Sequence, residues 1–194
     1  MRLELEKFSR KRMMTKQDGV TLLELIVVLA IFGIVASLAT LGLDGWHRSR
    51  LVSATGGLLS DLQTVRMSAM TESSALNGRG FGLRFIDNNS YKVFEFVDKG
   101  TTPYVDFNYE DTTEEVGGYE NELGNGISID PDPTGQIILY DKRGMSRTTN
   151  WSSVANKTYV VRHSSLAQGR CVTISQVRIR EGVWNATTSN CEVR

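Results

Sequence analysis

An uncharged stretch near the N-terminus constrains this chain more than any other feature. Residues 25–43 contain no charged side chain, and Glu24 is the one charge between residues 20 and 43. At about 1.5 Å per residue, these 19 residues would form a helix about 30 Å long, enough to span the core of a bilayer. Six basic and three acidic side chains precede residue 20, an excess that predicts a cytoplasmic N-terminus.

Glu24 separates the possible interpretations of this stretch. A secretory signal peptide has a shorter apolar core and a small-residue cleavage site, for which residues 36–39 are a weak candidate. A plain membrane anchor fits the length but leaves the carboxylate unexplained, because a charge at the centre of a membrane helix costs about 2.5–3.5 kcal/mol. The simplest alternative places Glu24 at the interface, in contact with water.

Residues 19–36, GVTLLELIVVLAIFGIVA, closely resemble the N-terminal segment of type IV pilins and type II secretion pseudopilins. The shared features are a basic leader, Gly19 before the cleavage point, Thr21, Glu24 as the fifth residue after the glycine, and Gly33 within the span. The resemblance implies that a prepilin peptidase cuts after Gly19 and N-methylates Val20. Such a cut leaves the apolar helix in the mature protein.

Some details of this segment depart from the pattern of the family. Val20 stands where most members have Phe, and Leu41 stands where many have a kinking Pro. Family leaders are short, and a start at Met14 or Met13 would give a leader of six or seven residues, whereas Met1 gives one of 19. The resemblance also gives Glu24 a partner, the α-amino group of a neighbouring subunit, so we expect Glu24 to set the register of assembly.

An amphipathic helix is predicted to continue the apolar stretch, so that one long helix covers residues 20–74. Five apolar residues recur at helical spacing and predict a buried face: Leu51, Leu58, Leu62, Val65 and Ala69. The opposite face carries charges and is expected in solvent: Arg48, Arg50, Asp61, Arg66 and Glu72. His47, just beyond the apolar stretch, is expected at the membrane interface.

Alternation of apolar and polar residues begins at residue 80 and predicts strands. A hairpin is expected over residues 81–85 and 91–97 with a turn at 87–90, followed by strands at 126–130, 136–141, 158–163, 170–175 and 177–182. One long helix followed by short strands indicates an α+β fold, with the helix packed on an antiparallel sheet. The predicted parts are a cleaved leader (1–19), a membrane helix (20–43), its amphipathic continuation (44–76) and a periplasmic β-rich domain (77–194).

Charge is distributed unevenly over this domain. Residues 98–126 are expected to form a long surface loop, and eight acidic residues between 98 and 122 face only Lys99. A calcium site is one interpretation of this segment, but its spacing matches no EF-hand, and a solvated acidic loop with no metal is the expectation. From residue 141 onward, nine basic residues stand against three acidic ones.

Three segments resemble the GspH/FimT family of pilin-like proteins: residues 59–70, 137–144 and 171–180. Some FimT-like proteins bind DNA through a Gly-Arg-x-Arg motif, and residues 177–180 keep both arginines, Arg178 and Arg180, with Val in place of Gly. On a strand, two residues two positions apart point to one face. Their guanidinium groups could bind DNA phosphates there, without sequence-specific contacts to the bases. A solvated strand face next to Glu181 is the alternative.

Cys171 and Cys191 enclose 19 residues. Because the predicted topology places them outside the cytoplasm, we expect a disulfide that fastens the C-terminal tail to the sheet and contributes about 3 kcal/mol.

The chain as a whole balances 22 basic against 22 acidic residues, so it has no bulk affinity for nucleic acid. No GxSxG, HExxH or P-loop motif is present in the sequence, which indicates a structural subunit with no cofactor. The implied partners are other pilin or pseudopilin subunits, prepilin peptidase, an inner-membrane assembly platform, membrane lipid and, for the FimT-like alternative, DNA. A membrane-anchored periplasmic enzyme or sensor is the alternative of another class.

Overall fold

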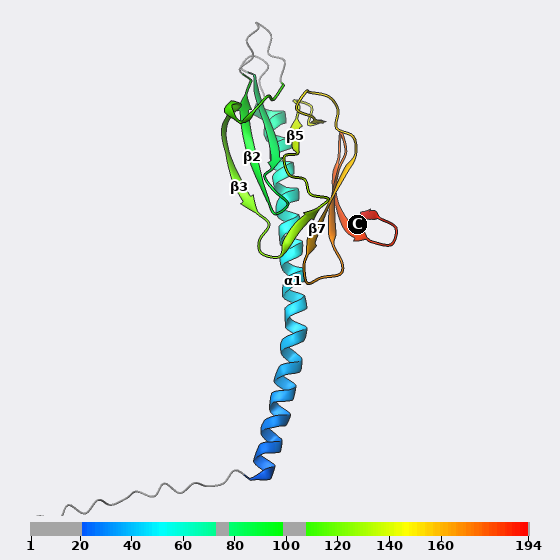
Figure 1. The fold of residues 1–194 in the computed structure, drawn as a ribbon. Helices are drawn as coiled ribbons and strands as arrows, with labels where there is room; N and C mark the ends of the chain where they lie inside the picture. The colour runs from blue at the N-terminus through cyan, green and yellow to red at the C-terminus, as the bar shows by residue number, and fades with distance from the viewer. Residues whose placement is uncertain (1–20, 73–77, 99–107, 194) are drawn as a thin grey trace, which may run out of the picture. The chain divides into compact units, whose positions relative to one another are not determined.

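The computed structural model of the chain describes residues 21–72, 78–98 and 108–193, and for residues 38–43 it describes the backbone alone. Within these ranges, helix α1 (Leu22–Glu72) is followed by ten strands, which confirms the α+β class (Figure 1). The chain divides into two units, residues 1–41 and residues 42–194. Gly19 and Val20 lie outside the described residues.

Two antiparallel sheets make up most of the second unit. The first has the strand order β3-β2-β1-β5-β6 and the second the order β10-β9-β8-β7-β4. The strands of the first sheet are β1 (Arg79–Phe85), β2 (Ser90–Val97), β3 (Glu115–Glu122), β5 (Ile137–Tyr140) and β6 (Ser146–Arg147). Those of the second are β4 (Ile127–Asp130), β7 (Lys157–His163), β8 (Arg170–Ile174), β9 (Ile179–Asn185) and β10 (Asn190–Val193).

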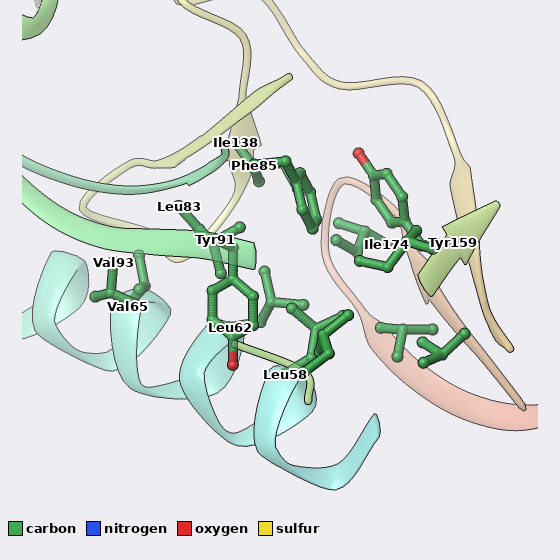
Figure 2. Close-up of a cluster of buried hydrophobic side chains, with 14 of the residues drawn as sticks. Leu58, Leu62, Val65, Leu83, Phe85, Tyr91, Val93, Ile138, Tyr159 and Ile174 are labelled. Carbon is green, nitrogen blue, oxygen red and sulfur yellow. The ribbon is translucent and has the colours of Figure 1, made fainter. Parts of the chain in front are cut away.

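The core of this unit lies where residues 51–69 of α1 meet both sheets. All five apolar residues predicted for the buried helix face are at most 3% exposed, which confirms the helical spacing. They pack with Leu83, Phe85 and Tyr91 from the first sheet and with Tyr159 and Ile174 from the second (Figure 2). Burial of this apolar stripe is what attaches the helix to the sheets, since helix propensity alone contributes little.

The hairpin of β1 and β2 forms where the sequence predicted it. Seven residues of β1 pair with β2, from Arg79 opposite Val97 to Phe85 opposite Tyr91. In the turn, the Asp87 carboxylate accepts backbone hydrogen bonds from Asn89 and Ser90, each at 2.7 Å. This is the turn chemistry that a short acidic side chain provides.

The prediction of a surface loop over residues 98–126 is wrong for the second half of that range. Residues Thr112–Glu114 form a 3-10 turn, and Glu115–Glu122 form strand β3, which pairs with β2. The strand has no apolar alternation, because it is the outermost strand of its sheet and most of its residues are exposed. An edge strand of this kind gains its order from backbone pairing, which hydropathy patterns do not report.

The acidic side chains of this segment are also less solvated than expected. Asp98 and Glu114 are 8% and 4% exposed. The Glu115 side chain, 5% exposed, lies 3.1 Å from Arg84 and 2.6 Å from Lys92, and it accepts a hydrogen bond from the Tyr109 hydroxyl at 2.7 Å. Carboxylates of Asp98, Glu110 and Glu114 lie within 4.8 Å of one another. The sequence showed the charge of the segment but not these tertiary contacts.

A second, smaller cluster lies on the other face of the first sheet. Phe94, Phe96, Tyr109 and Leu139 are buried there, with the Tyr109 ring 5.1 Å from that of Phe94 and 5.5 Å from that of Phe96. The hydroxyl of Tyr109 donates to Glu115, so this cluster is connected to the ion pairs of Glu115 with Arg84 and Lys92. Together these contacts hold the start of β3 in place.

Candidate assembly segment and basic turn surface

Thr21 defines the beginning of helix α1. Its side-chain oxygen Oγ1 accepts a hydrogen bond at 3.2 Å from the backbone N–H of Glu24. Thr followed three residues later by Glu is the sequence of a capping box, and a carboxylate in the first turn is favoured by the helix dipole. Glu24 therefore lies in the first turn of α1, where its side chain is exposed.

The first turns of helix α1 expose apolar side chains all around the helix. Between residues 22 and 35, every large apolar side chain is 46–78% exposed, with Leu22 at 78% and Phe32 at 70%. A helix that is apolar on all sides is normally covered by lipid or by other helices. Among the residues that the structure describes, however, no helix is both long and apolar enough to cross a membrane.

Comparison with known proteins bears on this same segment. Residues 14–40 match the family model of the prokaryotic N-terminal methylation motif, a range that contains Gly19, Val20 and Glu24. No curated protein and no solved structure matches the chain. The motif supports the class of type IV pilin-like subunits, which a prepilin peptidase processes and which assemble with other pilins through a membrane-anchored helix. The α+β fold of the second unit is consistent with that class.

The strand that was predicted to begin at residue 177 begins two residues later, at Ile179. Strand β9 begins at Ile179, so that Arg180 lies on the strand while Arg178 belongs to the turn before it. In that turn the backbone N–H of Arg178 donates to Ser175 Oγ at 3.1 Å, and the carbonyl of Arg178 accepts from the Ser175 backbone at 2.8 Å. The strand begins later than predicted because this hydrogen-bonded turn occupies residues 175–178.

The structure brings a second basic turn to the first one. The backbone N–H of Ser146 donates to the Gln176 carbonyl at 2.9 Å, and Ser146 Oγ donates to the Ser175 carbonyl at 3.1 Å. The turn between β5 and β6, which carries Lys142 and Arg143, is thereby tied to the turn between β8 and β9. We call the exposed residues Lys142, Arg143, Arg178 and Arg180 the basic turn surface.

No salt bridge joins any of these four cations to an acid of the described ranges. Other arginines of the C-terminal third are paired: Arg147 with Asp141 at 2.7 Å, Arg162 with Asp130 at 3.2 Å and Arg170 with Glu181 at 2.6 Å. Glu181, expected as a neighbour of the Arg178–Arg180 pair, is therefore engaged by Arg170. Lys142 and Arg143 were missed from sequence because only tertiary hydrogen bonds connect their turn to the other.

Cys171 of β8 and Cys191 of β10 form a disulfide with a Cα–Cα distance of 5.9 Å, the pairing that the sequence suggested. These strands are not neighbours, because β9 runs between them. The bond passes β9 at Gly182, where a Cβ atom would stand 2.9 Å from Cys191 Sγ and 2.5 Å from the Glu192 carbonyl oxygen. The missing side chain of Gly182 thus leaves the space that the disulfide uses.

A cavity of about 300 Å³ lies beside α1 among the described residues. Its lining includes Leu51, Leu166 and Val183 together with Arg48, Gln168 and Arg170. The guanidinium of Arg170 is already paired with Glu181. This set, drawn from the described residues, contains no nucleophile or general base, so the cavity lends no support to an enzymatic alternative.

Proposed function

We propose that this chain is a minor subunit of the GspH/FimT type, which joins a type II secretion pseudopilus or a type IV pilus. The observation that carries the proposal is the methylation motif over residues 14–40, followed by a helix that exposes apolar side chains on every side. In this proposal, residues 1–19 are the cleaved leader, the apolar helix enters the inner membrane with a cytoplasmic N-terminus, and residues 77–194 form the periplasmic domain. The assembly platform extracts the subunit from the membrane.

In this proposal, Glu24 forms an ion pair with a neighbouring subunit during assembly. Cleavage after Gly19 makes Val20 the N-terminus, and its α-amino group is the natural partner of a carboxylate among apolar helices. Pairing with Val20 of a neighbouring subunit neutralises both charges, whereas an unpaired charge in that setting is costly. The capping position of Thr21 supports this role, because it places Glu24 in the first turn of α1, four residues after Val20 in the sequence.

Two measurements test processing and assembly separately. Intact-mass analysis of the protein from cells with prepilin peptidase is expected to show a chain that begins at Val20 and carries one additional methyl group. Glu24→Ala is expected to remain in the membrane fraction but to be lost from sheared filaments, while Glu122→Gln, an exposed acid on β3, behaves like the unaltered protein. Normal incorporation of Glu24→Ala would reject the pairing role without affecting the processing result.

A second candidate function is non-specific binding of DNA by a FimT-like minor pilin. The observation that favours it is the basic turn surface, where Lys142 and Arg143 join Arg178 and Arg180 through the hydrogen bonds of Ser146. Cations from two turns and from the start of β9, none of them paired with a described acid, could contact successive phosphates. The hypothesis predicts salt-sensitive binding without sequence preference.

Gel shifts of the full chain in detergent test this second function. Replacing Arg143 and Arg178 together by Gln is expected to weaken binding and to reduce the slope of log affinity against log salt by about one for each phosphate that is no longer neutralised. Arg48→Gln, an exposed cation on α1, serves as the matched control. If the unaltered chain produces no shift at low salt, the basic turn surface does not bind DNA.

A further inference from the structure

Both histidines of the chain meet inside the second unit. His47 lies on α1 and His163 is the last residue of β7, yet their ring centroids are 4.3 Å apart at an interplanar angle of 39°. His163 is 4% exposed and His47 is half-buried. The expectation that His47 belongs to a membrane interface therefore misses its contact with the sheet.

Hydrogen bonding around the pair favours neutral rings. The backbone N–H of Ser165 donates to Nδ1 of His163 at 3.1 Å, so the proton of the neutral ring resides on Nε2. A second proton on His163 would break that bond. Nδ1 of His47 is buried and has no hydrogen-bond partner among the described residues, so a proton placed there would be poorly solvated.

The charges around the pair are predominantly positive. On α1, Arg50 lies over the ring of Trp46 with its Cζ atom 4.8 Å from the ring centroid, Arg48 is exposed, and Asp44 is exposed without a salt bridge to either histidine. On β7 and β4, Arg162 and Asp130 pair with each other at 3.2 Å. The loops beside His163 carry Ser164 and Ser165 on one side and the uncharged residues 123–126 on the other. No described carboxylate compensates a charge on either imidazole.

We propose that the stacked rings of His47 and His163 form an acid-sensitive latch, which holds residues 44–50 of α1 against the end of β7 when neutral and releases them when protonated. An imidazolium at His163 would lose the hydrogen bond from Ser165 and would carry its charge close to Arg50, so protonation of His163 weakens the contact. Opening lets the ring of His163 take up its proton in water. The latch stands independently of the proposed assembly function, because it depends only on contacts within residues 42–194.

The pH at which the latch opens follows from the energetics of His163. Burial, the charge of His47 and the charge of Arg50 lower the pKa of His163 below its ordinary value of 6.5. A base with a lowered pKa in the closed state binds more protons in the open state, so opening becomes easier as the pH falls below about 6.5. The open population is expected to grow about tenfold per pH unit for each proton taken up.

Hydrogen exchange of the full chain in detergent micelles with EDTA tests the latch. Between pH 7.5 and 5.5, and after correction for the intrinsic pH dependence of exchange, amides of residues 44–52 and 163–166 are expected to lose protection about tenfold. Amides of residues 58–69, which belong to the main core, keep theirs. Equal protection of residues 44–52 at the two pH values would overturn the proposal.

The matched variant is the double substitution His47→Phe with His163→Phe, which keeps two rings and leaves the chain without histidine. Its residues 44–52 are expected to show no acid response between pH 7.5 and 5.5. If the double variant opens as much as the unaltered chain, imidazole protonation is not the cause and the proposal fails. Should the double variant lose protection in residues 58–69, the single substitution His163→Phe replaces it, and its residues 44–52 are expected to respond less to acid than those of the unaltered chain. An equal response would overturn the proposal.

Discussion

The carboxylate of Asp61 on α1 accepts a hydrogen bond from the hydroxyl of Tyr91 on β2, with 2.7 Å between Oδ2 and the hydroxyl oxygen. The same carboxylate accepts from the Tyr119 hydroxyl at 2.9 Å and from the Asn121 side-chain amide at 2.7 Å, both on β3. One helix residue thus ties the edge strand and its neighbour to α1. Asp61 was expected on the solvent face of the helix, and the structure corrects that expectation.

Asp61→Ala is expected to lower the free energy of unfolding by about 1–3 kcal/mol, because it leaves the partly buried Tyr91 hydroxyl without its acceptor. Urea denaturation of the full chain in detergent measures the change. Thr64→Ala on the exposed side of the same helix provides the control and should shift stability by no more than about 0.5 kcal/mol. Equal effects of the two substitutions would show that the Asp61 contacts add nothing to stability.

Glu115→Gln is expected to destabilise the first sheet by about 3 kcal/mol at pH 7, because Arg84 and Lys92 would lose their shared counter-charge. Urea denaturation again provides the measurement. Glu120→Gln, an exposed acid on the same strand, is the control. A loss of stability no larger than that of the control would mean that solvent already screens the charges of Glu115, Arg84 and Lys92.

The acid dependence of the same network has a defined sign. Burial would raise the pKa of Glu115, but hydrogen bonds from Lys92 and Tyr109 and the charge of Arg84 outweigh it, so the pKa lies below its ordinary value of 4.5. A lowered carboxyl pKa stabilises the fold above about pH 4.5, and this contribution is lost as the pH falls further. The unaltered chain should therefore lose more stability than Glu115→Gln when the pH is lowered from 5 to 3.

Gly182→Val is expected to prevent the disulfide, because its Cβ would lie only 2.9 Å from Cys191 Sγ and 2.5 Å from the Glu192 carbonyl oxygen. A thiol count under denaturing conditions should find two free thiols in the variant and none in the unaltered chain. Gly117→Val is the matched control, since its added Cβ would meet no atom closer than 4.0 Å. Full oxidation of Gly182→Val would show that β10 can move away from β9 and still reach Cys171.

Arg50→Gln is expected to raise the pKa of His163, because the charge of Arg50 is one of the causes, after burial and His47, that hold it below 6.5. Histidine ring signals in a proton NMR titration report this shift directly. Arg48→Gln removes an exposed charge two residues away and should leave the His163 titration unchanged. Identical titrations for both variants would mean that burial and His47 alone lower the His163 pKa.

Regular patterns in the sequence predicted the regular parts of the fold. The spacing of Leu51, Leu58, Leu62, Val65 and Ala69 identified the buried helix face, because a helix returns each side chain to one face about every 3.6 residues. The turn at Asp87 identified the first hairpin. Strand β3 escaped prediction because residues such as Gly117 and Glu120 follow no apolar alternation, and its order comes from backbone pairing with β2.

Of the two candidate sites, one could be predicted from the sequence and the other depends on tertiary contacts. The methylation motif, with Gly19, Val20 and Glu24, is contiguous in sequence, and a family model recognises it without any tertiary information. The basic turn surface depends on hydrogen bonds between two turns about thirty residues apart, and the predicted strand begins after Arg178 because a turn precedes β9. A linear pattern cannot report such contacts.

The sequence by itself thus determined the N-terminal helix, its buried stripe and the methylation motif that supports a pilin-like class, because these depend on periodicity and on a local pattern. Only the tertiary structure decided which polar groups meet. Asp61 reaches β2 and β3, Glu115 neutralises two cations, and His47 stacks on His163 from a distant part of the chain. The physical reason is that burial changes the energetics of a polar side chain, and the partners that make its burial tolerable are brought by the fold from distant positions.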